Sequence, residues 1–431
     1  MVILVQVRHT APMSVDVISF GCRLNALDGE SVRALALKAG ARDVTVVNSC
    51  AVTAEAVRQA GQAARRAARE RPGAEIVVTG CAAQIEPRRF AAMTEVSRVI
   101  GNAEKLRPET WASDARPLAV ADAFEARDVP APPADAGVLL PRAFVQVQTG
   151  CEHRCTFCVI PFGRGAARST PPEAVVAEVR RVMEKGAVEA VLTGVDVTSW
   201  GDDLAGRPRL GDLVARLLRE VPELKRLRLS SLDAVEIDDR LLRLLGEEQR
   251  LMPHLHLSLQ SGDDMILKRM KRRHSRAEAL ALVEAVRRVR PDVAFGADVI
   301  AGFPTETDAM FDNTRALLEE AEIAYAHVFP FSPRPGTPAA RMPQIAGALV
   351  KERAALLRET GGRLLSRHLD ARVGRTIEIL SEGDGVGRAA DFSSVRIAPE
   401  TPKGAMLDAL ISGHDGRALI AARNAALASR P

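Results

Sequence analysis

Six cysteines are the residues of this chain best suited to metal chemistry. They form two sets of three: Cys22, Cys50 and Cys81 lie far apart, whereas Cys151, Cys155 and Cys158 lie close together. The close set has C-x3-C-x2-C spacing within "CEHRCTFC". Three thiolates suit a 4Fe–4S cluster, which is normally held by four ligands, so that one iron stays open to a substrate or cofactor. Two clusters of this kind would account for all six cysteines.

Zinc is the competing interpretation of the close set. A structural zinc site needs four ligands, and no second CxxC pair follows. His153 is nearby, but its place inside the loop makes it a poor partner for the flanking cysteines. A zinc-binding RNA-interaction protein without catalysis therefore stays as the alternative from another class. A thiol relay or redox sensor is a second alternative for the first three cysteines.

The elements around the first set indicate why distant cysteines could meet. "VDVISFGC", "DVTVVNSC" and "AEIVVTGC" are strand-like runs that each end in one of these cysteines, and each is followed by a helical stretch. Strands that alternate with helices predict a parallel sheet, whose strand carboxyl ends share one edge. We therefore expect Cys22, Cys50 and Cys81 to converge at that edge, in an open parallel-sheet domain over 14–121.

The second region continues the alternation of strands and helices. It predicts an incomplete (β/α)6 barrel or a doubly wound sheet over 142–368, with chemistry at the carboxyl ends of the strands. A Pro- and Ala-rich stretch, 122–141, separates the two regions as a linker. The predicted strands are 143–148, 188–193, 226–230, 254–259, 295–300 and 325–330.

The end of the chain has a different pattern. A long helix over about 346–369 precedes short alternating runs with glycine turns, which predict a small all-β barrel over 369–431. The sequence contains no Walker A loop, HExxH or GxSxG motif, which argues against P-loop nucleotidases, zincin proteases and serine hydrolases.

Composition narrows the class of protein further. The 431 residues carry a net charge of +4, which is compatible with a nucleic-acid partner. No run approaches 18 apolar residues and no signal peptide is evident, so we expect a cytoplasmic protein without membrane segments. We interpret the first twelve residues as either foreign to the natural protein or a disordered extension.

A set of motifs in order resembles one family over 14–422. They are "FGCRLN", "VVNSCAVT", "VVTGCAAQ", "VIGNAEK", "VQTGCEHRCTFCVIPFGRG", "VLTGVDVTSWGDDL", "HLHLSLQSGDDMILKRMKRR", "DVIAGFPTET" and "HVFPFSPRPGTPAARMP". The chain resembles the radical S-adenosylmethionine methylthiotransferases. This resemblance implies a methylthiotransferase N-terminal domain, a partial (β/α)6 barrel and a C-terminal TRAM domain that binds RNA.

The resemblance also implies a reaction. The cluster on the first three cysteines would carry a sulfide that one S-adenosylmethionine methylates. A second S-adenosylmethionine would be reductively cleaved at the other cluster, and the radical would take hydrogen from adenine C2 before methylthio transfer. The motifs resemble most the branch that modifies N6-threonylcarbamoyladenosine next to the tRNA anticodon, at position 37. Isopentenyladenosine in tRNA and an aspartate of a ribosomal protein are the alternative substrates.

Further residues and partners follow from the resemblance. Arg164 and Arg168 are candidate contacts to the threonylcarbamoyl carboxylate or to a phosphate, because guanidinium forks suit both. We expect the partners to be tRNA, a sulfur donor and an electron donor such as flavodoxin or ferredoxin. The expected S-adenosylmethionine contacts are Gly194, Ser230, Gln260, Asp298 and Gly302. The expected RNA contacts are Arg388, Phe392, Arg396, Lys271 and Arg272.

Overall fold

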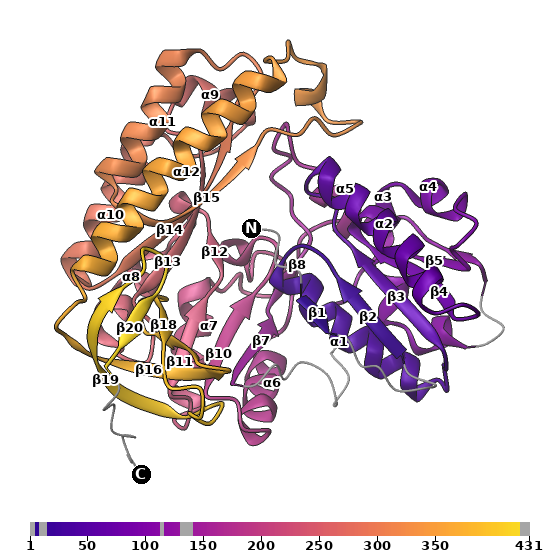
Figure 1. The fold of residues 1–431 in the computed structure, drawn as a ribbon, viewed down its shortest axis with the longest axis horizontal. Helices are drawn as coiled ribbons and strands as arrows, with labels where there is room; N and C mark the ends of the chain where they lie inside the picture. The colour runs from indigo at the N-terminus through magenta and orange to yellow at the C-terminus, as the bar shows by residue number, and fades with distance from the viewer. Residues whose placement is uncertain (1–4, 8–14, 113–115, 130–140, 423–431) are drawn as a thin grey trace.

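The structure is a computed structural model, and it describes residues 5–7, 15–112, 116–129 and 141–422. These residues form three parts in chain order: an open sheet with helices on both faces, a curved wall of parallel strands wrapped by helices, and a small closed barrel (Figure 1). The expected α/β architecture is confirmed. Among the described residues, no helix combines the length and the apolar character needed to cross a membrane.

The N-terminal sheet has its strands in chain order, β1 to β6. Its five parallel strands are β2 (Val15–Ser19), β3 (Val44–Ser49), β4 (Glu75–Gly80), β5 (Arg98–Ile100) and β6 (Leu118–Ala119). β1 (Val5–Val7) pairs antiparallel with β2 at the edge. The prediction of a disordered extension is therefore wrong for Val5–Val7, and residues 1–4 and 8–12 lie outside the described residues.

Two helices cover opposite faces of this sheet. α1 (Arg23–Lys38) packs on the face that carries Val17 and Val46, whereas α2 (Ala54–Glu70) packs on the face of Ile18 and Val47. Successive strand residues thus enter different cores, which explains strands that are apolar throughout. The shorter helices of this part and of the predicted linker are α3 (Cys81–Ile85), α4 (Pro87–Ala91), η1 (Glu104–Leu106), η2 (Pro108–Trp111) and η3 (Ala123–Glu125).

The central part contains six parallel strand positions. They are β7 (Arg142–Gln146), β10 (Glu189–Thr193), β11 with β12 (Arg226–Leu229, Ser231–Leu232), β13 (His254–Gln260), β14 (Ala294–Ala301) and β15 (Ile323–Pro330). A parallel bridge from Leu227 to Leu251 joins the two halves of the wall. The outer strands β7 and β15 do not pair with each other in the described part of the chain, so the barrel is partial.

Helices cover the outside of this wall. The outward residues of β7, Ala143 and Val145, enter the helix-packed core, whereas the alternate residues, such as Phe144, face the inside. A two-stranded ladder of β8 (Gln148–Thr149) and β9 (Arg168–Ser169) frames the loop that carries Cys151. The helices are α5 (Ile160–Arg164), α6 (Pro172–Glu184), η4 (Val197–Ser199), α7 (Leu210–Glu220), η5 (Ala234–Glu236), α8 (Asp239–Glu247), α9 (Asp264–Met270), α10 (Arg276–Val289), α11 (Asp308–Glu320), η6 (Pro338–Arg341) and α12 (Gly347–Asp370).

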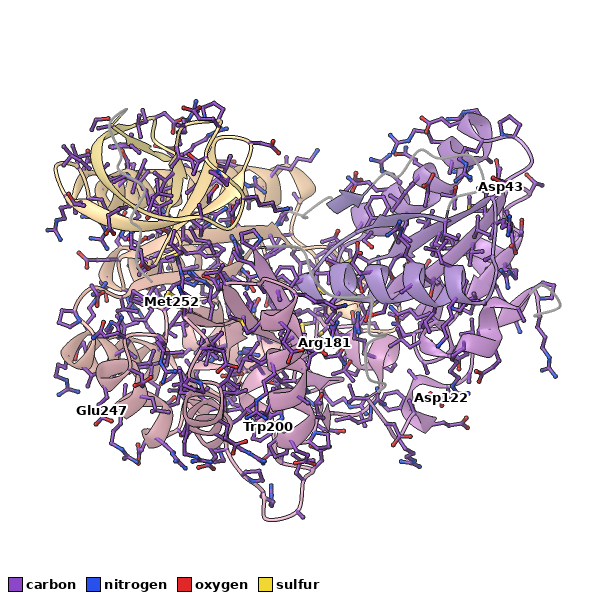
Figure 2. The ribbon with its side chains drawn as sticks, turned by 90° about the horizontal axis from the view of Figure 1, so that it is seen from below. Asp43, Asp122, Arg181, Trp200, Glu247 and Met252 are labelled. Carbon is purple, nitrogen blue, oxygen red and sulfur yellow. The ribbon has the colours of Figure 1, made fainter. Side chains whose placement is uncertain are left out.

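The C-terminal part is a closed barrel in the order β16-β17-β18-β20-β19. It docks on the amino ends of the central strands: Arg228 Nη1 donates to the Ala390 carbonyl at 3.1 Å, and the Tyr325 and Ser393 hydroxyls lie 2.9 Å apart. Figure 2 shows the body of this barrel against the central part, at a distance from the labelled Asp43 and Asp122. Its strands are β16 (Thr376–Gly383), β17 (Val386–Ala389), β18 (Ser394–Arg396), β19 (Met406–His414) and β20 (Leu419–Ala421).

Candidate active site

The first cysteine set lies where three neighbouring parallel strands end. Cys22 precedes α1 after β2, Cys50 follows β3, and Cys81 begins α3 directly after β4. The loops approach closely, because a Cβ added to Gly21 would lie 2.7 Å from both Cβ and Sγ of Cys50. Gly21 also has a φ of +100°, which a side chain would strain. The sequence therefore needs glycine before Cys22 to bring these cysteines together.

The electrostatics confirm that these thiols are neighbours. Burial, followed by the charges of Cys81 and Cys22, raises the pKa of Cys50 to about 12. Burial also raises the pKa of Cys22, Arg164 opposes this, and Cys81 adds to it. Cys22 is enclosed by many protein atoms, which accounts for its raised pKa, yet it keeps a surface open to solvent, whereas Cys50 and Cys81 are buried. Like charges at this spacing disfavour three free thiolates, so without a bound cation the thiols stay protonated.

Amide side chains hold these loops. Asn25 Nδ2 donates to the carbonyls of Phe20 and Ser49, and Asn48 Nδ2 donates to the Asn25 carbonyl at 2.6 Å. Asn102 Nδ2 lies 3.5 Å from Cys81 Sγ, within reach of a weak hydrogen bond to sulfur. Such contacts orient the ligands of a metal site.

A buried ion network lies behind this set. Asp28 Oδ2 accepts from Lys105 Nζ and from Arg164 Nη2, each at 2.7 Å, and the Arg164 fork also reaches Asn25 Oδ1 at 2.7 Å. Both cations lower the pKa of Asp28 against the effect of burial. The network carries two positive charges and one negative charge, which favours an anionic group on the cysteine side.

Arg164 and Arg168 line an internal cavity and contact other residues of the chain. Arg168 donates to the carbonyls of Ala126 and Arg164, at 2.8 and 3.0 Å. Both arginines line a cavity of about 130 Å³ together with Asp28 and Arg127. Their expected contact with substrate stays a prediction, and the protein already engages Arg164 Nη2 and both Nη atoms of Arg168.

The second cysteine set lies on the loop between β8 and α5. The Cys158 amide donates to the Cys155 carbonyl at 3.1 Å, and the Cys151 amide donates to Gly165 at 3.2 Å. Thr156 ties this loop to the end of α9, where its hydroxyl donates to the Arg269 carbonyl at 2.8 Å. Burial raises the pKa of Cys151, and Asp196 and the thiols of Cys158 and Cys155 add to this effect. Burial also raises the pKa of Cys158 to about 12, with Cys155 adding to the effect.

The two cysteine sets face each other across the contact between the N-terminal and central parts. The charge of Cys81 raises the pKa of Cys158, and a Cβ on Gly163 would lie 3.2 Å from Cys81 Cβ. Asn102 completes this contact, since its amide also donates to the Gly163 carbonyl. Residues beside the two cysteine sets therefore belong to one contact between the parts.

Two family profiles match the parts that carry these cysteines. The Radical SAM superfamily matches residues 145–318, and the Uncharacterized protein family UPF0004 matches residues 14–101. A threonylcarbamoyladenosine tRNA methylthiotransferase, MtaB, of Rickettsia prowazekii is 47% identical over 89% of this chain and 91% of its own length. The chain belongs to the radical S-adenosylmethionine tRNA methylthiotransferase family.

Other members of the methylthiotransferase family and one solved structure are also similar. The MtaB protein of Aquifex aeolicus is 34% identical over 85% of this chain and 92% of its own. A tRNA-2-methylthio-N(6)-dimethylallyladenosine synthase of Erythrobacter litoralis is 36% identical over 87% of this chain and 88% of its own length. The methyltransferase TsrM of Kitasatospora setae shares the fold at a TM-score of 0.51 and 14% identity, over 72% of this chain and 68% of its own.

One of the predicted RNA contacts, Arg272, lies beside the second cysteine set. Arg272 is largely buried, and its Nη1 lies 3.6 Å from Cys155 Sγ. Its Nη2 donates to Asp233 at 2.7 Å and to the Ser258 carbonyl at 2.8 Å. α9 ends with Lys271 at φ +58°, and the turn directs Arg272 inward, so the expected contact of Arg272 with RNA stays a prediction that its position does not favour.

The other predicted RNA contacts differ in exposure. Lys271 and Arg396 are exposed, and Arg396 forms an ion pair with Asp415. Arg388 bonds Glu382 at 2.9 Å and lies over the Phe392 ring. Phe392 points toward the central barrel, where it stacks on His254 with ring centroids 4.7 Å apart. Their exposure thus favours Lys271 and Arg396 as RNA contacts. Arg388 and Phe392 lie instead where the C-terminal barrel docks on the central part.

The predicted cofactor contacts lie along the carboxyl half of the central strands. Gly194 packs against Gln148, and Gly302, with φ +73°, packs against Val350. Ser230 is buried between β11 and β12 with no hydrogen-bond partner for its hydroxyl among the described residues. Gln260 ends β13 with φ +66°. These positions agree with a ligand at the strand ends, and the individual contacts stay predictions.

Asp298 lies inside β14, and its carboxylate contacts two histidines on neighbouring strands. His256 Nε2 lies 2.9 Å from Asp298 Oδ1, and His327 Nδ1 lies 3.3 Å from the same oxygen. The strand register places these residues side by side on the inner wall. Period-two alternation in "HLHLSL" and "AHVF" indicates the inward face, but the pairing of strands is needed to bring them together.

His153 lies beside Cys151 but bonds carboxylates. Its Nε2 is 2.6 Å from Asp196 and 3.7 Å from Glu236. Burial lowers the pKa of His153, and these two carboxylates outweigh it and raise it to about 10. His153 thus has carboxylate partners beside the second cysteine set.

Proposed function

We propose that this chain transfers a methylthio group to C2 of N6-threonylcarbamoyladenosine next to the tRNA anticodon, at position 37. The observation that carries the proposal is that both cysteine sets lie at one contact between the N-terminal and central parts, in a chain 47% identical to a protein named for this reaction. An unactivated aromatic C–H bond requires a radical, and facing centres suit one that generates it and one that delivers sulfur.

The thiol sets fit the groups that this reaction requires. Cys22, Cys50 and Cys81 would hold an auxiliary 4Fe–4S cluster, and Cys151, Cys155 and Cys158 would hold the radical-generating one. Three thiolates leave one iron open in each case. When bound, the clusters and S-adenosylmethionine supply the sulfur, the methyl group and the radical.

The residues of the chain position these groups. Asn102 directs an N–H group at Cys81, and Arg272 directs a cationic N–H group at Cys155. The Lys105–Asp28–Arg164 network keeps a positive charge behind the first set. Gly194, Ser230, Gln260, Asp298 and Gly302 are our candidates for S-adenosylmethionine contacts at the strand ends.

Several partners belong to the same proposal. We assign Lys271 and Arg396 to RNA phosphates, because both are exposed cations on separate surfaces. The C-terminal barrel would act as the TRAM domain. The reaction requires tRNA, a sulfur donor and an electron donor such as flavodoxin or ferredoxin, and we place it in the cytoplasm, where thiols stay reduced.

Two measurements test the proposal. Anaerobic reconstitution should yield about eight iron atoms per chain in two distinguishable clusters, whereas bound zinc without iron would contradict it. Mass spectrometry of tRNA nucleosides from a deletion strain should show loss of the methylthio form of threonylcarbamoyladenosine alone. Loss of methylthio-dimethylallyladenosine instead would assign the chain to the reaction named for its 36% identical relative.

A further inference from the structure

Arg23 is a half-buried cation between two aromatic rings. It directly follows Cys22 and is the first residue of α1. Its guanidinium carbon lies 6.0 Å from the centre of the Phe144 ring and 5.6 Å from that of Phe392. In the part of the chain that the structure describes, no hydrogen bond or ion pair engages this guanidinium.

The other guanidinium groups around Phe392 have carboxylate partners. Arg142, Arg228 and Arg388 lie 5.2, 5.0 and 4.8 Å from the ring centre. Arg142 and Arg228 bond Glu189, and Arg388 bonds Glu382. Arg23 therefore adds a positive charge beside these three arginines, whose carboxylate partners, Glu189 and Glu382, are already in ion pairs.

The position of Arg23 connects the first cysteine set to the barrel interior. Phe144 lies on β7 between Ala143 and Val145, which pack outward, so its ring faces the inside. β7 is an edge strand of the partial barrel, and α1 belongs to the N-terminal part. Arg23 thus extends from the loop of Cys22 toward the space that the central strands enclose.

We propose that Arg23 binds an oxyanion of the substrate RNA, namely the carboxylate of the threonylcarbamoyl group. This inference rests on the proposed function. The substituent on N6 and the reacting C2 belong to one purine ring, so the residue that contacts the substituent must lie near the auxiliary cysteines. A guanidinium fork matches a carboxylate, and flanking rings exclude water from the pair. An apolar dimethylallyl group offers Arg23 no partner.

A backbone phosphate offers the same charge, and a binding experiment separates the two sources. Reconstituted protein without reductant is titrated with two anticodon stem-loops that differ only in threonylcarbamoyladenosine or adenosine at the target position. Wild type should prefer the modified stem-loop, and Arg23→Gln should lose about 10- to 100-fold of affinity for it alone. Lys38→Gln removes one charge from the exposed end of α1 and should change neither affinity.

Each alternative result overturns the inference. An equal loss for both stem-loops would assign Arg23 to a phosphate, and no loss for either would leave it without a substrate role. Arg23→Lys keeps the charge without the fork, so it should bind the modified stem-loop with intermediate affinity. Because this variant preserves the cation between the rings, it keeps the test available where Arg23→Gln does not fold.

Turnover separates this inference from the proposed function. Wild type that fails to methylthiolate the modified stem-loop would contradict the proposed function itself. Wild type that succeeds, with an Arg23→Gln variant of unchanged KM, would contradict only the role of Arg23. The iron content of wild type and of Arg23→Gln shows whether the first cysteine set, which includes the neighbouring Cys22, still binds its cluster.

Discussion

Arg272 Nη1 lies 3.6 Å from Cys155 Sγ, while Asp233 holds the other nitrogen of the same guanidinium at 2.7 Å. A fixed cation beside one thiolate stabilises negative charge on that ligand. Hydrogen bonds to the sulfurs are among the factors that set the potential of an iron–sulfur centre. This pair gives Arg272 a role in positioning and tuning the second cysteine set.

Replacement of Arg272 tests this role. Arg272→Gln should make the reduction potential of the radical-generating cluster more negative and slow 5′-deoxyadenosine formation about tenfold or more. A redox titration followed by electron paramagnetic resonance measures the potential, and chromatography measures the product. Lys268→Gln, which changes an exposed residue of α9, is the control. An unchanged potential in Arg272→Gln would refute the role.

Loss of one auxiliary ligand should separate the two halves of the reaction. Cys50→Ala should reduce iron from about eight to about four atoms per chain and abolish methylthiolation while S-adenosylmethionine cleavage continues. Cys155→Ala should instead abolish cleavage. Full methylthiolation by Cys50→Ala would show that Cys50 does not hold the auxiliary cluster.

The buried ion network should contribute to stability. Lys105 is fully buried, and its Nζ bonds Asp28 and Asn102, each at 2.7 Å. Lys105→Met should lower the free energy of unfolding by about 2–3 kcal/mol, because Asp28 keeps Arg164 but loses one charged hydrogen bond. Urea denaturation measures the change. Arg58→Gln, which removes an exposed ion pair with Glu55, should leave stability unchanged.

Glu189 should make stability depend on acid pH. Burial raises its pKa, but Arg228, Arg142 and Arg226 outweigh burial and lower it from 4.5 to about 2. A lowered pKa stabilises the fold above the unfolded value, and the contribution of about 3 kcal/mol disappears as pH falls from about 4.5 toward 2.

Glu189→Gln should therefore be less stable than wild type above about pH 5, and the difference should shrink toward pH 2. Urea denaturation at a series of pH values measures this difference. A difference that stays constant over the whole series would show that the carboxylate charge is not the stabilising factor.

The cysteine geometry was accessible from the sequence because it depends on local rules. Each of Cys22, Cys50 and Cys81 follows a strand, and parallel strands bring their carboxyl ends to one edge. The six central strands also follow from alternation, and the observed bounds differ from the predicted ones by one or two residues. The direction of side chains in turns and loops could not be predicted from strand and helix periodicity.

Arg272 and Phe392 illustrate that limit. The run "LKRMKRRHSR" contains consecutive cations, and only the left-handed residue Lys271 decides which of them turns inward. Phe392 also has a positive φ, +74°, in a turn whose direction depends on the barrel beneath it. The partners of Asp298 come from two other strands, so their meeting depends on sheet register.

The unpaired edges of β7 and β15 have a topological consequence. A fully closed barrel offers only its two ends as entrances, and here the C-terminal barrel with Phe392 covers one of them. An anticodon lies in the middle of a polynucleotide, far from either terminus, so it has to be presented sideways. An open wall allows a single base to be inserted laterally, with the hairpin that carries it left outside.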